Sequence, residues 1–522
     1  MGQRVDALAP QRLVGPLCPP AALEDSVSRL CKEKENERTM HGCTDGPSRQ
    51  IEKEARHVRH YQKLVSTVCV IIAFLIVGCD GRGGESVGPT LFAAIAPTTY
   101  SAYTGTDAKQ IPHAPALGPA NSIIQDPTFG SRILRVTDAH TNSGDSLIPE
   151  YAGYFRTWNA DSTALKLHGP HGTSYWLEFE SSSFSVGDGS ARPTLHPLSF
   201  DVKWEWSAVD PDSIYFINGN QLAKYNKATQ EVTDLGPPQS VPLGYHALVV
   251  GADAWICSAA GSAGQNTYTQ IYCLNPNDPS QHKFIDILKK TINGIAQHDP
   301  HWPTSAAGQT IGIHAMYGSA AGAWLDVGFV HHSWGANGDS VFNLSTNTWS
   351  LMTNANMYSS GHSSIGAKFV NGCGSINGMY SGGACLRDPS NLMDTTQYTF
   401  IMQPPSTATG WHDGEHSSWF NASTNPEAPV LFSRYNISTP PSPVPWYGEI
   451  IAAATDGSNT VWRFAHNHNG GLVGSYTGQS FAQISNDGRW ALFSSPWDGT
   501  LGPSSGDFDY PTRLDTFIVE LK

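Results

Sequence analysis

Four short β-rich runs between residues 201 and 235 decide the fold. They read Trp204-Glu205-Trp206-Ser207, Ser213-Ile214-Tyr215-Phe216-Ile217, Gln221-Leu222-Ala223-Lys224-Tyr225 and Glu231-Val232-Thr233. Asp-Pro-Asp separates the first two runs and Asn-Gly-Asn the second and third, and both tripeptides are typical of tight turns between antiparallel strands. The stretch therefore predicts a four-stranded meander, which is the unit from which β-propellers are built.

Similar units follow one another along most of the chain. Their approximate limits are residues 154–188, 200–236, 244–288, 295–352, 359–403, 410–466 and 476–521. This spacing is typical of blades with loop insertions, so we expect an all-β fold, a β-propeller with seven four-stranded blades. The last unit shows only three strands, and we expect an N-terminal strand at residues 131–138 to complete it and close the ring. A two-sheet sandwich is the alternative.

The composition fits a turn-rich folded chain. Of 522 residues, 51 are Gly and 35 are Pro, and only 15% are charged. Such a chain has enough apolar residues for a core and is not of the disordered type. The formal net charge of -14 argues against a nucleic-acid partner, because phosphate backbones repel an acidic protein.

The N-terminal region predicts export. Residues 64–78 form an uncharged apolar run that follows Arg56, Arg59 and Lys63. The run is shorter than the about 20 residues of a membrane helix and suits the apolar part of a secretory signal. It ends in Ile-Val-Gly-Cys at Cys79, which resembles the lipobox of bacterial lipoproteins, in which the cysteine carries lipid. A plain membrane anchor is the alternative.

These features divide the chain into three parts. We expect an N-terminal extension with the secretion signal at residues 1–78, a flexible tether at residues 79–122 and a β-propeller domain at residues 123–522. The tether is rich in Gly, Ala, Pro, Ser and Thr and lacks periodic apolar residues. The mature protein is expected in a bacterial cell envelope, anchored to a membrane by lipid on Cys79 and facing the periplasm or the exterior.

Four cysteines follow the signal. Cys257 and Cys273 lie on adjacent predicted strands, and Cys373 and Cys385 flank a Gly-rich loop. Because exported proteins form disulfides, pairing within each local couple is the simplest of the three connectivities. Four buried free thiols are the alternative.

Histidines recur at the start of several units. Gly-His362-Ser-Ser and Glu-His416-Ser-Ser open two of them, and Tyr-His246-Ala-Leu opens an earlier one. Equivalent positions in successive repeats lie at the same level of the assembled protein. Farther along, His466-Asn-His468 places two imidazoles on one side of an extended segment, where both can bind one ion. We therefore expect a divalent metal site formed by His362, His416, His466 and His468, with strand capping or core packing as the alternative.

The chain from about residue 359 onward resembles known bacterial propellers. The segment Val461-Trp462-Arg463-Phe464-Ala465-His466 and the turn Ser485-Asn486-Asp487-Gly488 are similar to those of largely uncharacterised secreted propellers. The turn looks like the Ser-Pro-Asp-Gly turn of TolB-type and oligogalacturonate-lyase propellers. In oligogalacturonate lyases, histidines near the propeller axis hold a divalent metal and a His-x-His pair contributes. The resemblance thus implies the same role for His466 and His468, although Arg463 stands where that family has Gln.

Further residues are candidates for ligand binding. His298 and His301 open a unit in Gln-His-Asp-Pro-His-Trp, although this is also ordinary turn and packing chemistry. Trp302 and Trp419 lie in segments expected at the mouth of a blade, and a Trp face suits a sugar ring, although many propeller Trp residues pack between blades. The candidate ligand-binding residues are His246, His298, His301, Trp302, Trp419 and Arg463.

Two functions fit these features. One is a cell-envelope propeller that binds a carbohydrate or an envelope protein through its top face without catalysis. The alternative is a metal-assisted polysaccharide lyase that acts on uronate-containing polymers. In the lyase, a cation or an arginine would neutralise the uronate carboxylate, and a neutral histidine or tyrosine would take the adjacent proton. The candidate catalytic residues are His362, His416 and Arg434.

Overall fold

The computed structural model describes most of the chain after residue 93. The described residues are 94–150, 155–200, 203–261, 267–333, 338–351, 363–373, 383–392, 394, 397–403, 415–434, 444–469, 479–504 and 512–522. The predicted secretion signal, Cys79 and His362 lie outside these ranges. Within the ranges, no helix reaches the length and apolarity that a membrane crossing requires.

The predicted meander is present. Strands β8 (Glu205–Trp206), β9 (Ser213–Asn218), β10 (Gln221–Asn226) and β11 (Glu231–Asp234) form one antiparallel sheet in chain order. Asn218 pairs with Gln221 across the turn between β9 and β10, and Gly219 takes a φ of 62° there. Gly219 is the first of the two loop residues, and glycine adopts this left-handed conformation without steric cost, which explains why the Asn-Gly-Asn signal predicts the hairpin.

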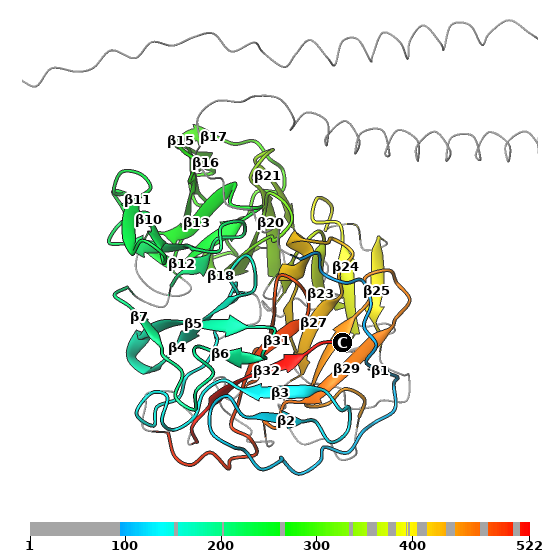
Figure 1. Ribbon diagram of the computed structural model, residues 1–522. Coiled ribbons are helices and arrows are strands. Elements are labelled where there is room, and N and C mark those ends of the chain that lie inside the picture. Colours follow the sequence, from blue (N-terminus) through cyan, green and yellow to red (C-terminus); the bar gives the residue numbers. More distant parts are fainter. Residues whose placement is uncertain are drawn as a thin grey trace, which may run out of the picture. The chain divides into compact units, whose positions relative to one another are not determined.

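Six more antiparallel sheets are built from the described residues (Figure 1). The sheet before the predicted meander contains β4 (Ala164–His168), β5 (Ser174–Glu180), β6 (Ser185–Val186) and β7 (His196–Leu198). The sheet after the meander contains β12 (Leu243–Val250), β13 (Trp255–Ala260), β14 (Gln270–Asn275), β15 (Asp278–Asp286), β16 (Thr291–Ile292) and β17 (Ile295–Ala296). The next two contain β18 (Gly312–Gly318), β19 (Trp324–Val330), β20 (Gly338–Asn343) and β21 (Thr348–Leu351), then β22 (Ser364–Ile365), β23 (Phe369–Cys373), β24 (Gly383–Arg387) and β25 (Tyr398–Met402).

The last two sheets also take strands from the beginning of the described chain. One contains β26 (Glu415–Ser418), β27 (Val430–Arg434), β28 (Glu449–Ala453) and β29 (Val461–His466), with β1 (Tyr103–Thr104) at its edge. The other contains β30 (Gln483–Ile484), β31 (Trp490–Ser495) and β32 (Asp515–Glu520), followed by β3 (Arg132–Arg135) and β2 (Ile123–Gln125). Two short 3-10 turns, η3 (Pro170–Gly172) and η4 (Phe420–Ser423), complete the described elements.

Apolar side chains fill the space between sheets that follow one another in the sequence. Leu386 and Trp419 belong to one such cluster, and Ala164 and Trp204 belong to another. Phe179 of the β4–β7 sheet packs edge-on against Trp490 of the β30–β32 sheet, with ring centroids 5.1 Å apart, so the first and last units also touch. Antiparallel meanders whose faces pack against one another in this way are the architecture of a β-propeller.

The expectation of regular four-stranded blades is wrong in detail. Four sheets have four strands, two have five and one has six. Most additions come from segments outside the expected units, and β17 comes from the first residues of the expected unit 295–352. β16 and β17 form a small extra hairpin beside β15, and β1 and β2 belong to the N-terminal segment. Uniform blades therefore do not describe this chain.

The expected tether is not a disordered linker over residues 94–122. β1 pairs with β29 through Tyr103 and Arg463, and the Trp446 indole donates a hydrogen bond to the Gly105 carbonyl at 3.0 Å. These contacts join backbone groups of a Pro-rich segment to partners more than 300 residues away. The sequence carries no periodic signal for such a segment, because it forms almost no secondary structure of its own.

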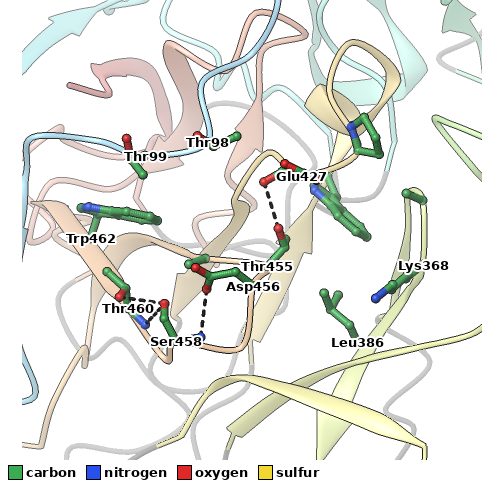
Figure 2. Close-up of a pocket in the computed structure, with 14 residues that line it drawn as sticks. Thr98, Thr99, Lys368, Leu386, Glu427, Thr455, Asp456, Ser458, Thr460 and Trp462 are labelled. Carbon is green, nitrogen blue, oxygen red and sulfur yellow. Dashed lines mark hydrogen bonds between the residues drawn. The ribbon is translucent and has the colours of Figure 1, made fainter. Parts of the chain in front are cut away.

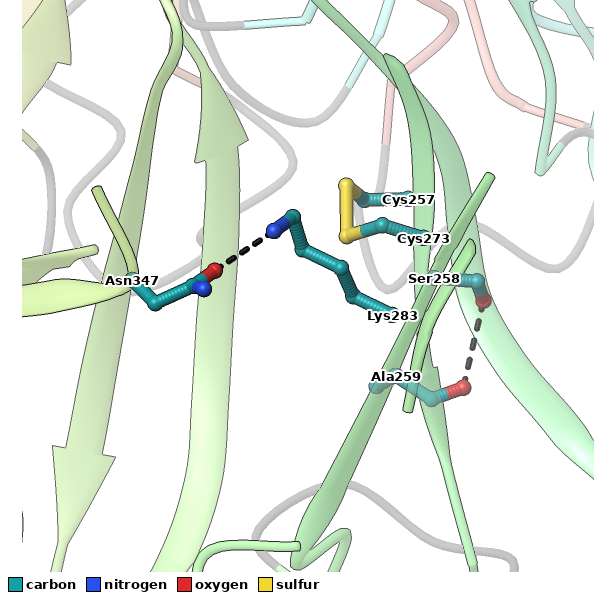
Figure 3. Close-up of a disulfide and its surroundings, with 6 residues drawn as sticks. All are labelled: Cys257, Ser258, Ala259, Cys273, Lys283 and Asn347. Carbon is teal, nitrogen blue, oxygen red and sulfur yellow. Dashed lines mark hydrogen bonds between the residues drawn. A yellow bond between two sulfur atoms is a disulfide. The ribbon is translucent and has the colours of Figure 1, made fainter. Parts of the chain in front are cut away.

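Cys257 and Cys273 form the predicted local disulfide (Figure 3). The two residues are direct partners on β13 and β14, so the bond joins neighbouring strands of one sheet. Lys283 lies beside it and donates a hydrogen bond to Asn347 at 2.5 Å. Cys385 is also disulfide-bonded. Four free thiols are therefore excluded.

Candidate functional site

The predicted His-x-His pair lies at the end of β29. The strand residues from Val461 to Ala465 are all buried, and His466 ends the strand opposite Glu449. Asn467 still donates its backbone N–H to the Gly448 carbonyl at 2.8 Å, which keeps the segment against the sheet. His468 then adopts a φ of 49°. Both histidines are buried, with 0% and 2% of their surface exposed.

A carboxylate faces the Nδ1 atom of each histidine. Asp126 Oδ2 accepts the backbone N–H of His466 at 2.8 Å and lies 3.3 Å from its Nδ1. Asp498 Oδ2 lies 3.3 Å from Nδ1 of His468. A carboxylate at this distance favours the tautomer in which Nδ1 carries the proton, and it leaves the Nε2 lone pair free.

The two Nε2 atoms are buried and have no hydrogen-bond partner among the described residues. The imidazole centroids are 6.2 Å apart. Burying a nitrogen lone pair without a partner costs free energy. A histidine held through Nδ1 by a carboxylate, with Nε2 available, is the usual arrangement of a metal ligand.

Aromatic rings enclose the pair. Phe129 stacks on His466 with centroids 5.0 Å apart, and Trp497 lies 4.6 Å from His468. Such rings exclude water and restrict rotation of the imidazoles. Burial by itself raises the pKa of Asp126, but the hydrogen bonds and charge of His466 outweigh it and hold that pKa below its ordinary value, so Asp126 stays ionised.

His416 occupies a separate position in the same region. It lies on β26 opposite Ser433, and its Nε2 is 2.6 Å from Gln479 Oε1, while its ring packs near Phe481 with centroids 4.7 Å apart. No group of three or more His, Cys, Asp or Glu side chains within the described ranges is arranged to hold a metal. The structure thus brings His466 and His468 together, and the four-histidine set remains a prediction.

Arg463 serves a structural role. Its guanidinium is fully buried and pairs with Glu449 at 2.7 and 2.6 Å. It also contacts Asp107 of the N-terminal segment at 3.2 Å. Burial, partly offset by Arg463, raises the pKa of Glu449. The expected contact of Arg463 with a ligand is therefore replaced by a closed internal ion pair.

The other predicted residues are dispersed. His298 is exposed and His301 is half-buried in the loop before β18. Trp302 is buried, donates to the Ile287 carbonyl at 2.9 Å and packs near Trp349, so it belongs to the core. His246 lies on β12 and Arg434 on β27. Only the backbone of these two residues is described.

Trp419 lines a surface cavity of about 660 Å³ (Figure 2). The cavity's wall residues come from β24, β29, the N-terminal segment and the loops near β23, β26 and β28. They are Thr98, Thr99, Ala367, Lys368, Leu386, Trp419, Pro426, Glu427, Ala454, Thr455, Asp456, Ser458, Thr460 and Trp462. Thr455 donates to the Glu427 carbonyl, and the Ser458 backbone donates to Asp456, both at 2.9 Å. Hydrogen bonds from Ser458 lower the pKa of Asp456, and Lys368 lines another part of the cavity wall.

Sequence reasoning missed the residues that orient the histidine pair. Asp126 precedes a proline and Asp498 precedes a glycine, so each reads as an ordinary turn residue. Asp126 is indeed also a turn residue, because its Oδ1 accepts from the Thr128 and Phe129 backbones at 2.8 Å. Only the fold places these carboxylates beside histidines.

Known proteins resemble this chain only distantly. No family model and no curated protein matches this chain. Among solved structures, an oligogalacturonate lyase in complex with manganese is 11% identical, with a TM-score of 0.47 over 78% of this chain and 98% of the other. An oligogalacturonate lyase from Vibrio parahaemolyticus is 11% identical, with a TM-score of 0.44 over 76% and 96%. The Cps50 (Swd1) β-propeller domain of Myceliophteria thermophila is 10% identical, with a TM-score of 0.34 over 66% and 95%. Likeness at this level says nothing of activity.

Proposed function

We propose that the protein is a metal-dependent propeller that cleaves uronate-containing polysaccharide by β-elimination, with His466 and His468 as metal ligands. One observation carries the proposal: two buried imidazoles lie close together, each held by a carboxylate at Nδ1, and neither Nε2 has a hydrogen-bond partner within the described part of the chain. Imidazole nitrogens bind divalent transition metals at about 2 Å. We propose that the two Nε2 atoms supply part of the coordination shell of one such ion.

Uronate is the substrate class that this site favours. Two neutral histidines leave the full charge of a divalent cation uncompensated, so a bound cation would attract a carboxylate and make the neighbouring C–H more acidic. His416 is the described candidate for the base, and Gln479 at its Nε2 fixes the orientation of the ring. His362 and Arg434 remain proposed catalytic partners.

The test is an assay of the purified protein on a panel of uronate polymers with Mn²⁺. We expect unsaturated products, detected by ultraviolet absorbance, and loss of turnover on adding a chelator. His466→Ala should lower turnover at least about 100-fold, in line with loss of a metal ligand, whereas His298→Ala, at an exposed position, should not. Turnover that survives both the chelator and His466→Ala would refute the proposal.

A second candidate function is glycan binding without catalysis in the cavity of Figure 2. The supporting observation is the combination of Trp462 with Lys368, Glu427 and Asp456 around one opening, because an indole beside charged groups suits a sugar ring and its hydroxyls. Trp462→Ala should then abolish binding on a glycan array while His466→Ala leaves it intact. Binding that depends on His466 would assign the glycan to the histidine site instead.

We also propose that β3 closes the ring and that the protein is held in the cell envelope by lipid on Cys79, with a carbohydrate or an envelope protein as its partner. The pairing of Ile133 with Val519 supports the closure, and the Cys257–Cys273 disulfide suits an oxidising compartment. Deleting residues 123–140 should leave the edge of β32 unpaired and cause aggregation. A soluble, equally stable deletion variant would contradict the closure, and mass spectrometry of the membrane-extracted protein tests the lipid.

A further inference from the structure

The N-terminal segment that we call the strap, residues 94–130, runs along several sheets of the propeller (Figure 1). At its start, Asn425 donates to the Ala96 carbonyl at 2.8 Å, and the Tyr100 hydroxyl donates to the Gly488 carbonyl at 2.7 Å. β1 then adds to the edge of β29. The strap is therefore fixed to the propeller at points distant from one another.

Two further attachment points of the strap lie at the histidine pair. Asp126 and Phe129 of the strap contact His466, the first through Nδ1 and the backbone N–H and the second by stacking. On the other side, the backbone N–H of Ala114 donates to Asp498 Oδ2 at 3.1 Å. This is the same oxygen that faces Nδ1 of His468.

The strap also fixes the ring that packs on His468. The Trp497 indole donates a hydrogen bond to the Pro115 carbonyl at 2.7 Å. The ring centroids of Trp497 and His468 are 4.6 Å apart. Each histidine is thus oriented by one carboxylate and one aromatic ring. The strap supplies both groups for His466 and holds both groups for His468.

We propose that the strap is a positioning element of the histidine site, in which Asp126 fixes the tautomer and the ring orientation of His466. The metal-binding part of this inference rests on the proposed function, and the tautomer part does not. Asp126 is pre-organised for the role, because its second oxygen is already held by two backbone N–H groups of its own turn. Loss of a carboxylate behind a ligating histidine lowers metal affinity by about 10- to 100-fold.

The experiment compares wild type with Asp126→Asn by two measurements. Long-range ¹H–¹⁵N correlation spectra of the metal-free protein report the tautomer of His466, and calorimetric titration reports Zn²⁺ affinity. We expect wild-type His466 with its proton on Nδ1, and in Asp126→Asn a mixed population and a 10- to 100-fold weaker Zn²⁺ affinity. Asp107→Asn is the matched control, because Asp107 is a strap carboxylate that contacts Arg463 and neither histidine. It should change neither measurement.

An Asp126→Asn protein with unchanged tautomer would overturn the inference. If wild type binds no Zn²⁺, the proposed function fails, while the tautomer shift on Asp126→Asn still supports the strap's role. If Asp126→Asn does not fold, Phe129→Leu replaces it, since that change leaves the carboxylate in place and removes the stacked ring. Phe129→Leu should weaken Zn²⁺ binding, and unchanged affinity in that variant would contradict the inference.

Discussion

Two pairs of closely spaced histidines in this chain have opposite surroundings. His466 and His468 lie at the end of β29, buried, each facing a carboxylate at 3.3 Å. His298 and His301 lie in the loop before β18, where the His301 side chain is 45% exposed and stands 3.9 Å from Asp299. In sequence both pairs read as candidate ligands. The difference shows that sequence spacing alone does not distinguish a buried histidine pair that faces carboxylates from an exposed pair in a loop.

The physical reason is the cost of an unpartnered polar atom. An exposed imidazole is solvated whatever its orientation, so the loop before β18 gains nothing by fixing its histidines. A buried Nε2 without a hydrogen bond destabilises the fold, and the surrounding structure must offset that cost. Such an arrangement is typical of functional sites.

The largest expected effect concerns the ion pair beside the buried histidines. Arg463→Leu leaves Glu449 buried without its partner, so we expect a loss of about 3–5 kcal/mol in the free energy of unfolding. Lys289→Leu, at a pair whose lysine is 74% exposed, should cost less than about 1 kcal/mol. Urea unfolding at neutral pH measures both. Equal losses in the two variants would show that burial does not determine how much each ion pair contributes to stability.

The next effect is a pH dependence of the free energy of unfolding that arises from the buried carboxyl group of Glu205. Burial raises the pKa of Glu205 from 4.5 to about 7, although backbone N–H groups of Arg156 and Val249 donate to it. A folded-state pKa above the unfolded value means that Glu205 stabilises the fold below pH 4.5 and that this contribution disappears as the pH rises through about 7. The change is on the order of 3 kcal/mol.

Glu205→Gln should flatten the fall in stability over this pH interval, measured by urea unfolding at several pH values. Glu231→Gln provides the control, because Glu231 is exposed on β11 of the same sheet. We expect the control to follow the wild-type pH profile. A wild-type profile that rises between pH 4.5 and 7 in a manner dependent on Glu205 would contradict the direction of this pKa shift.

The histidine pairs themselves should differ in metal affinity. His468→Ala removes one proposed ligand, and we expect Mn²⁺ affinity to fall at least about 100-fold, which corresponds to about 2.7 kcal/mol. His301→Ala should leave the affinity unchanged. Calorimetric titration of both variants decides the point, and a larger effect at His301 would reverse the comparison.

The smallest effect is on stability in the exposed loop. His301→Ala should change the free energy of unfolding by less than about 0.5 kcal/mol, because the imidazole is half-exposed and its contact with Asp299 is long. Thermal unfolding measures this change. A loss above about 1 kcal/mol would mean that the loop histidine has a structural role that its exposure does not reveal.

Much of the fold could be predicted because it depends on local sequence signals. The site could be predicted only in part, because it depends on contacts between residues far apart in the sequence. The Asn-Gly-Asn turn and the β-rich run around Ile214 identify the β8–β11 meander, because hairpins depend on neighbouring residues. The spacing of His466 and His468 identifies a pair for the same reason. Asp126, by contrast, lies 340 residues from His466, and no local pattern connects them. The strap could not be predicted because its sequence has no periodic pattern and it is held in place by tertiary hydrogen bonds.

The central claim is that His466 and His468 bind one divalent ion, and anomalous X-ray scattering from crystals of the protein grown with Mn²⁺ tests it most directly. The account predicts an anomalous peak that lies about 2.0–2.3 Å from Nε2 of both histidines, with Nδ1 of each still facing Asp126 and Asp498. The account would be contradicted by crystals in which Mn²⁺ binds only at other sites and the two Nε2 atoms form hydrogen bonds with protein groups or water.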